Sequence, residues 1–203
     1  MVMQRADIKE ESVLVQKATR GDRAAFSALV RLHMRAVVSV CYKILGNRDD
    51  AEDVAQDVFV QVYRKLKSFR GDASFKSWVL RIAHNRSLNF IRDNRRHSSS
   101  ETVSIDAEMN ESGLKLKDLL PAGDETRPDS MMEAARNRRI LFDSLAALPE
   151  KYAEPFSMHK LDQMPYAEIA ENLGLSLPAV ETRIHRAKMM LQKEIAARLK
   201  SER

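Results

Sequence analysis

The sequence predicts an all-α protein: two small helical domains joined by a flexible acidic linker, the C-terminal one containing a helix-turn-helix. Only 6% of the 203 residues are aromatic and six are glycine, a composition that favours helices over sheets. Apolar residues recur at helical spacing in several long segments. Net charge is +8 over residues 1–97, −5 over 98–130 and +2 over 131–203. This division indicates two modules and a connector.

Four helices are expected in the first module. The first is a short helix around residues 11–19. The second begins after Asp22, which suits an N-cap, and ends at Gly46, which suits a C-terminal stop. The third spans about 49–66 and carries one continuous apolar face. Ser74 then caps the fourth helix.

The fourth helix combines a packing stripe with an unusual polar ridge. Arg81, Asn85, Asn89 and Arg92 recur at steps of four, four and three residues, so they share one side of the helix. Asparagine is a poor helix former, so two aligned asparagines call for an explanation. Their amides can hydrogen-bond to base edges, and the arginines can neutralise phosphates. A solvated polar face with Trp78 in the core explains the same residues equally well.

The third helix carries an acidic row. Asp49, Asp53 and Asp57 are spaced by four residues, with Gln56 beside them. Acidic residues in a first turn also suit the helix dipole, and the other reading is a docking surface for a basic partner. A metal site is the weaker alternative, because neither a histidine pair nor a calcium-loop glycine pattern accompanies the acids. No metal and no cofactor are therefore expected.

Residues 98–130 lack sustained periodicity and are rich in serine, glycine, proline and acids, which is typical of a mobile connector. Helices are expected again over about 132–147, after Pro149, and twice between residues 166 and 199. The domain boundaries that follow are 1–97 for the first module, 98–130 for the linker and 131–203 for the second module.

A helix-turn-helix pattern is the clearest local signal in the second module. Gly174 permits the turn, Ser176 caps the next helix, and Pro178 lies in its first turn, where a missing N–H costs least. The second helix of such a motif enters the major groove of DNA. An ordinary helical hairpin with a charged face is the alternative. The side chains expected to face DNA are Ser176, Ala179, Glu181, Thr182, Arg183, His185 and Arg186.

The charge, the single cysteine and the hydropathy of the sequence restrict the class of protein further. The basic first module makes nucleic acid the first partner to consider. The single cysteine, Cys41, cannot form an internal disulfide, and its apolar neighbours indicate core packing. The sequence contains neither a run of 18 uncharged apolar residues nor a signal-peptide core. We therefore expect a soluble cytoplasmic protein without direct membrane insertion.

Three blocks in order carry a resemblance to a known family. They are DDAEDVAQDVFVQVYRKLKSF, then FRGDASFKSWVLRIAHNRSLNFIRDNRR, and then LPEKYAEPFSMHKLDQMPYAEIAENLGLSLPAVETRIHRAK. From about Val13 to its end, the linker apart, the sequence resembles an extracytoplasmic-function (ECF) sigma factor, group 4 of the bacterial sigma-70 family. The resemblance implies a non-enzymatic initiation factor that binds core RNA polymerase, recognises the −10 and −35 promoter elements and promotes strand opening.

The resemblance also assigns roles to residues. It places the acidic helix on the clamp helices of polymerase, a further contact on the flap region, and the linker in the polymerase channel. It assigns the −10 element, as single strand, to the fourth helix and the loop before it, and the −35 element, as duplex, to the helix-turn-helix. An anti-sigma factor is the implied inhibitor. The implied polymerase-binding residues are Asp49, Asp53, Gln56 and Asp57, and the implied −10 residues are Phe69, Trp78, Asn85, Asn89 and Arg92.

The sequence departs from the family pattern on the recognition helix. Many relatives carry a basic residue at the position of Glu181, and often glycine and threonine at those of Pro178 and Ala179. The base preference at the −35 element is therefore left open. The rival functions are a helix-turn-helix regulator that binds duplex DNA without polymerase, a metal-dependent nuclease using the acidic helix, and a purely structural helical adaptor. The first leaves the acidic helix and the asparagine ridge without a role.

Overall fold

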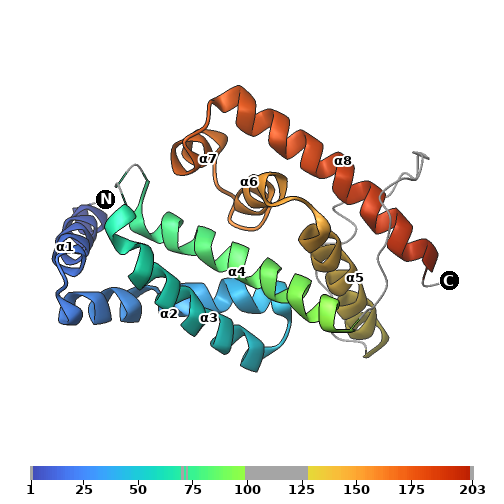
Figure 1. Cartoon of the computed structure of the whole chain (residues 1–203), viewed down its shortest axis with the longest axis horizontal. Coiled ribbons are helices and arrows are strands. Elements are labelled where there is room, and N and C mark those ends of the chain that lie inside the picture. The colour runs from blue at the N-terminus through green and yellow to red at the C-terminus, as the bar shows by residue number, and fades with distance from the viewer. Residues whose placement is uncertain (1, 70, 72, 99–127, 202–203) are drawn as a thin grey trace.

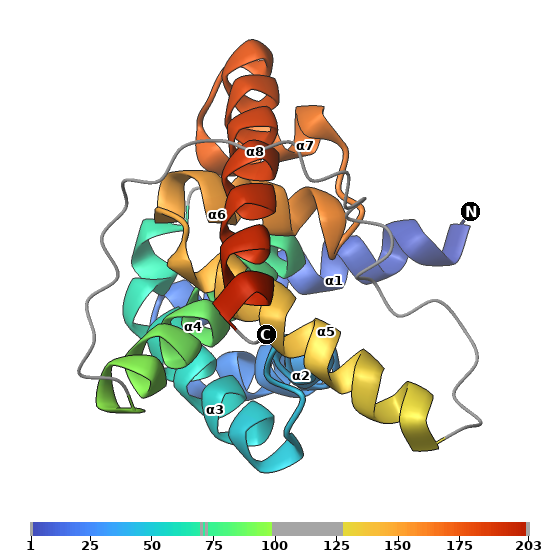
Figure 2. The ribbon, with the colours of Figure 1, turned by 90° about the vertical axis from the view of Figure 1, so that its right-hand side faces the viewer.

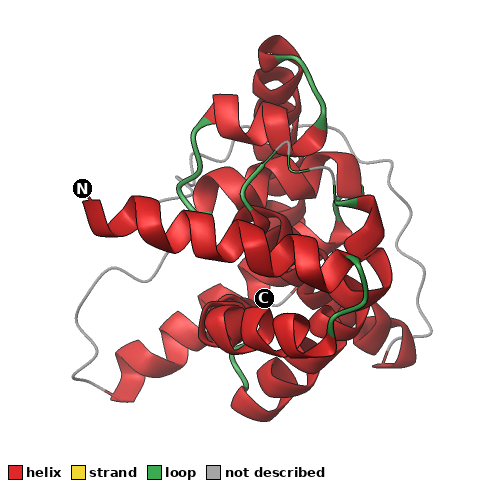
Figure 3. Cartoon of the chain, turned by 90° about the vertical axis from the view of Figure 1, so that its left-hand side faces the viewer, coloured by secondary structure: helices red, strands yellow, loops and turns green. Residues whose placement is uncertain are grey.

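The computed structural model describes residues 2–69, 71, 73–98 and 128–201, and these form helices joined by short loops (Figure 3). The all-α prediction is confirmed. The connector predicted at 98–130 lies almost entirely outside the described residues. The helices are α1 (Val2–Thr19), α2 (Arg23–Leu45), α3 (Arg48–Lys65), α4 (Phe75–Ser98), α5 (Pro128–Ala147), α6 (Glu150–Lys160), α7 (Tyr166–Leu173) and α8 (Leu177–Ser201), with a short 3-10 helix at Leu66–Ser68.

Helices α1 to α4 pack together around the predicted apolar faces (Figure 1). The face of α3 is buried as expected, with Val54, Val58 and Val62 at most 2% exposed. Cys41 is fully buried, and burial raises the pKa of its thiol, as suits a core residue. The expected start of the first helix at residue 11 was too late, because α1 begins at Val2.

Capping residues set the ends of α2 as the sequence predicted. The Asp22 carboxylate accepts a hydrogen bond from the backbone N–H of Ala25 at 3.0 Å, which satisfies a donor that the first turn leaves free. Gly46 takes a left-handed conformation (φ 73°) and its N–H donates to the Tyr42 carbonyl. Asp22 therefore sets where α2 begins, and Gly46 sets where the chain turns toward α3.

Helix α2 is long and apolar enough, by length and composition, to cross a membrane. The same helix contacts α1, α3 and α4. Leu29, Val37 and Cys41 are fully buried within it. Its apolar character therefore serves the core of the first module.

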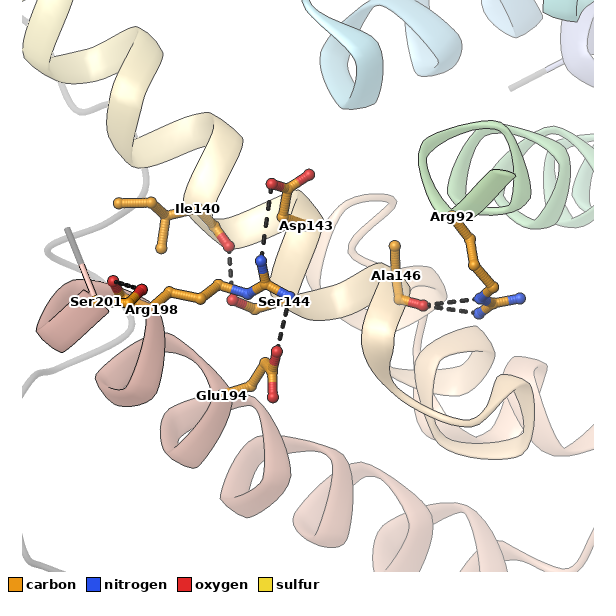
Figure 4. Close-up of polar contacts among 8 residues, drawn as sticks. All are labelled: Arg92, Ile140, Asp143, Ser144, Ala146, Glu194, Arg198 and Ser201. Atoms are coloured by element: carbon orange, nitrogen blue, oxygen red, sulfur yellow. Dashed lines mark hydrogen bonds and ion pairs between the residues drawn. The ribbon is translucent and has the colours of Figure 1, made fainter. Parts of the chain in front are cut away.

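Helices α5 to α8 form a second cluster, in which α6 lies between α4 and α8 (Figures 1 and 2). Arg198, near the C-terminal end of α8, links α8 to α5. Its guanidinium contacts the carboxylates of Glu194 at 2.7 Å and of Asp143 on α5 at 3.9 Å (Figure 4). Leu145, Met158 and Leu191 are each at most 1% exposed and fill the centre of the cluster.

The two clusters touch each other along α4. Helix α4 contacts α5 and α6 of the second cluster as well as α2 and α3 of the first. Its buried residues therefore belong to one apolar core that continues across both clusters. This arrangement determines which faces of α4 are free.

Candidate nucleic-acid interface

The aromatic residues at the start of α4 form a cluster with the loop before it. The ring of Phe69 lies 5.1 Å from that of Trp78 and 5.6 Å from that of Phe75, centroid to centroid. Phe75 is 4% exposed, whereas Phe69 and Trp78 are only partly buried. Phe75 anchors the cluster in the core, and the other two rings keep surface on which a base could stack.

A cleft of about 660 Å³ opens between α3 and α4. It brings together three of the five predicted −10 residues, Trp78, Asn85 and Asn89. Phe69 joins them through its contact with Trp78. The lining also includes residues for which the sequence analysis proposed no DNA contact, among them Gln61, Arg64, Lys65, Ser68 and Arg86.

The basic lining of this cleft could not have been anticipated from its one signal in the sequence. Arg64 and Lys65 occupy the last turn of α3, where cations also suit the helix dipole. That local explanation does not reveal that they line a cleft with Asn85, because only the packing of α3 against α4 brings them there. With Arg81 and Arg86 they give the cleft four cationic side chains, and Asp57 and Glu150 also line it.

The polar ridge of α4 makes hydrogen bonds to the second cluster. Glu154 of α6 accepts from the Arg81 guanidinium at 2.6 Å and from the Asn85 amide at 2.9 Å. Arg81 also donates to the backbone carbonyl of Asn172 at 2.9 Å. Glu154 is 9% exposed and was not among the site residues predicted from the sequence.

Arg92 lies at the other end of the ridge, away from the cleft. Its guanidinium donates to the carbonyl of Ala146 at 3.0 Å and 2.8 Å, from two of its nitrogens (Figure 4). A third nitrogen donates to the Asn89 side chain at 2.7 Å. The structure thus places Arg92 against the C-terminal end of α5, where free carbonyls attract a cation.

The acidic row runs along an exposed side of α3, and its last member, Asp57, also lines the cleft between α3 and α4. Asp49, Asp53, Gln56 and Asp57 are all exposed. Asp57 forms an ion pair with Arg86 of α4, so its charge is partly neutralised within the molecule. Asp49 and Asp53 have no such ion pair among the described residues.

The helix-turn-helix is formed by α7 and α8. Gly174 is left-handed (φ 62°, ψ 39°), and its N–H donates to carbonyls of α7. Val180 and Ile184 are buried against the motif as predicted. Among the side chains expected to face DNA, Ser176, Glu181, Thr182, His185 and Arg186 are exposed, and Ala179 and Arg183 are partly buried.

Arg186 of this set interacts with α6. The Arg186 guanidinium is the main cause that lowers the pKa of the Tyr152 phenol on α6. The Thr182 hydroxyl donates to the carbonyl of Pro178 at 2.8 Å. Both side chains remain exposed, so these contacts orient them without covering them.

Substituting Gly174 tests the turn. Gly174→Ala is expected to lower the free energy of unfolding by about 1–2 kcal/mol, because a Cβ disfavours the left-handed conformation. An added Cβ would meet no atom within 4 Å, so the loss reports backbone strain alone. Gly174→Asn should cost less, since asparagine tolerates this conformation. Urea denaturation measures both, and equal stability of the alanine variant and the parent chain would contradict the assignment.

Each of the two helical clusters matches a known protein family. Residues 29–97 match the Sigma-70 region 2 family, and residues 138–191 match Sigma-70, region 4. The ECF RNA polymerase sigma-E factor of Escherichia coli (strain K12) is 33% identical over 186 residues, covering 91% of this chain and 94% of that protein. The factor of the same name from Haemophilus influenzae is 31% identical over 91% of this chain and 95% of its own length.

A solved structure shares the fold. It is that of CnrH in complex with the cytosolic domain of CnrY, and the two chains superpose with a TM-score of 0.51 at 26% identity. The match covers 93% of this chain and 98% of the other.

Proposed function

Because the chain belongs to the extracytoplasmic-function sigma factors of the sigma-70 family, we propose which of its surfaces meet polymerase and DNA. It is an alternative RNA polymerase sigma factor, and its family is one of initiation factors rather than enzymes. The proposal rests mainly on the positions of three residues. Trp78, Asn85 and Asn89 line one cleft, next to the exposed acidic row of α3.

Core RNA polymerase would bind the outer face of α3. A row of carboxylates at four-residue spacing presents negative charge along one side of a helix, which complements a basic partner. Asp49 and Asp53 would carry most of this attraction. Asp57 would contribute less, because Arg86 already compensates its charge. Gln56 supplies hydrogen bonding in the same row.

The −10 element would bind as single strand at the cleft between α3 and α4. Capturing a base that has left the stack must offset an unstacking cost of a few kcal/mol. Stacking on an aromatic ring contributes about 1–3 kcal/mol per base, and the exposed surfaces of Phe69 and Trp78 are available for it. The Asn85 and Asn89 amides would read base edges. Arg64, Lys65 and Arg81 would hold the phosphates.

The −35 element would bind as duplex against the start of α8. Arg183, His185 and Arg186 supply positive charge to the phosphates, and Thr182 and Glu181 can contact base edges. The acidic side chain of Glu181 suits a cytosine amino group. Two elements about 17 base pairs apart lie about 58 Å apart along the duplex, so both modules must separate to reach them together.

Arg186→Ala tests the phosphate contact. If Arg186 binds one phosphate, the slope of log K against log salt concentration for the holoenzyme on promoter duplex should become shallower by about 0.9. Glu171→Gln, on exposed Glu171 of α7, serves as the control and should leave the slope unchanged. A slope that stays the same in Arg186→Ala would remove Arg186 from the DNA backbone.

We expect the activity of this chain to be regulated by a protein that binds it, as in its family. A solved relative was captured with the cytosolic domain of a partner protein. We expect this chain to bind an anti-sigma factor in the same manner and to act in the cytoplasm, where RNA polymerase resides.

Run-off transcription tests the proposed function as a whole. Bacterial core polymerase would be supplied with a randomised promoter pool, with and without the protein. Specific starts that require the protein are expected, and the enriched sequences would define its −10 and −35 elements. Specific binding to promoter duplex without polymerase, together with no starts, would instead identify a helix-turn-helix regulator.

A further inference from the structure

A row of ring contacts leads from the aromatic cluster at the start of α4 into the core of the first module. Phe75, whose ring contacts those of Phe69 and Trp78, also lies 5.5 Å from the imidazole of His33 on α2, centroid to centroid. His33 is 6% exposed, whereas Phe69 and Trp78 are only partly buried. His33 is therefore the buried end of a row of rings whose other end keeps surface for a base.

Helix α1 adjoins this row of rings at two places. Glu11 Oε1 of α1 lies 2.7 Å from His33 Nε2, and the two side chains are 19% and 7% exposed. Neither atom has a hydrogen-bond partner among the described residues, so the pair lacks the alignment of a hydrogen bond and its attraction is electrostatic. Helix α1 also contacts the 3-10 helix at Leu66–Ser68, which ends directly before Phe69 (Figure 1).

We propose that His33 is a positioning residue of the −10 site. Its neutral ring, held beside Glu11, supports Phe75 and so keeps the stacking surfaces of Phe69 and Trp78 in place. This inference rests on the proposed −10 function of the cleft between α3 and α4. It adds helices α1 and α2, for which the sequence analysis proposed no part in DNA recognition.

Support of this kind matters because a base gains most from a ring that is already in position. A ring that must first be ordered loses part of the stacking free energy to that ordering. One contact between aromatic rings changes an equilibrium by about twofold to tenfold. The effect of His33 on base capture should therefore have this size, although His33 itself touches no DNA.

The charge state of His33 depends on the groups that face it from α1 and α4. Burial is the largest cause, and it lowers the pKa of the imidazole; Glu11 raises this pKa and Lys76 of α4 lowers it. The result lies below the ordinary histidine pKa of about 6.5. The support should therefore be complete above a pH of about 6.5. It should be lost as the pH falls through the lowered pKa of the folded state, because a charged imidazole is disfavoured in the core.

Substitutions on α2 separate support of the −10 site from core packing in general. His33→Ala removes the ring, and His33→Phe keeps a ring that cannot titrate. Val37→Ala, one turn along α2 at a fully buried position, is the control for a cavity in the core. The measurement is the Kd of the holoenzyme for a single-stranded oligonucleotide carrying the −10 element that run-off transcription selects.

At neutral pH, His33→Ala should raise this Kd about twofold to tenfold. His33→Phe and Val37→Ala should leave it close to that of the parent chain, and all three variants should bind core polymerase normally. An unchanged Kd in His33→Ala, or equal losses in His33→Ala and Val37→Ala, would return His33 to the core and overturn the inference.

The pH profile is a readout that core packing alone would not move. Over a pH range of about 5 to 8, the parent Kd should rise as the pH falls, by up to about tenfold for each pH unit below the folded-state pKa of His33, because only the neutral fraction is competent. Dividing by the Kd of His33→Phe at each pH removes the titration of polymerase and oligonucleotide. Identical profiles in the parent chain and His33→Phe would overturn the role of the neutral imidazole.

A matched pair on α1 tests the part of Glu11. Glu11→Gln removes the carboxylate that raises the pKa of His33, so the acid loss should move to lower pH. Glu10→Gln makes the same change in charge at an exposed neighbour and should not move it. Equal shifts in both variants would remove Glu11 from the support. Asn85→Ala detects failure of the −10 assignment itself, because its Kd would then equal that of the parent chain.

Discussion

Asp53→Arg is expected to weaken binding to core RNA polymerase at least about a hundredfold, or about 3 kcal/mol. Asp53 is exposed on the outer face of α3 and makes no ion pair among the described residues, so its charge is available to a basic partner. Reversing it places like charges across the interface, which costs several kcal/mol. The measurement is an equilibrium titration of labelled polymerase with the variant.

Two comparisons make this result specific. Glu10→Arg changes an exposed residue of α1 by the same charge and should leave polymerase binding unaltered. Asp57→Asn should cost less than Asp53→Asn, because Asp57 already faces Arg86. Equal losses at Glu10 and Asp53 would show that only net charge matters and would remove α3 from the polymerase interface.

Asn85→Ala in the holoenzyme is expected to reduce discrimination between the preferred −10 sequence and single-base variants by about 1–3 kcal/mol. One well-placed contact between an amide and a base edge has this magnitude. The amide lines the cleft between α3 and α4. Competition between promoter fragments, with start sites counted for each, measures the discrimination.

Polymerase affinity separates this effect from a folding defect. Asn85→Ala should bind core polymerase as the parent chain does, because Asp49 and Asp53 lie outside the cleft that Asn85 lines. The variant also loses one hydrogen bond to Glu154. A loss of polymerase affinity equal to the loss of discrimination would contradict the assignment of Asn85 to the −10 element.

Local chemistry made much of the fold predictable. The ends of α2 follow from Asp22 and Gly46, whose hydrogen bonds join residues three or four positions apart. The turn at Gly174 follows from the same kind of short-range requirement. Periodic apolar positions identified the buried faces of α3 and α8, because helical spacing alone decides which side chains share a face.

Contacts between distant segments could not be predicted in this way. Arg81 and Glu154 are 73 positions apart, and no periodicity links them. One available signal was Glu154 itself, an acidic residue in the otherwise apolar and polar-neutral stretch AEPFSM. A buried carboxylate requires a partner, but the sequence does not say which donor supplies it. The pairing of Asp57 with Arg86 escaped prediction for the same reason.

The central claim is that the ridge of α4 binds the −10 strand in the open complex. Placing a photo-crosslinking amino acid at Asn89, next to Arg92 on that ridge, tests it most directly. The open complex on a promoter should crosslink to the non-template strand. Open complexes that start transcription without any crosslink to DNA would contradict the claim.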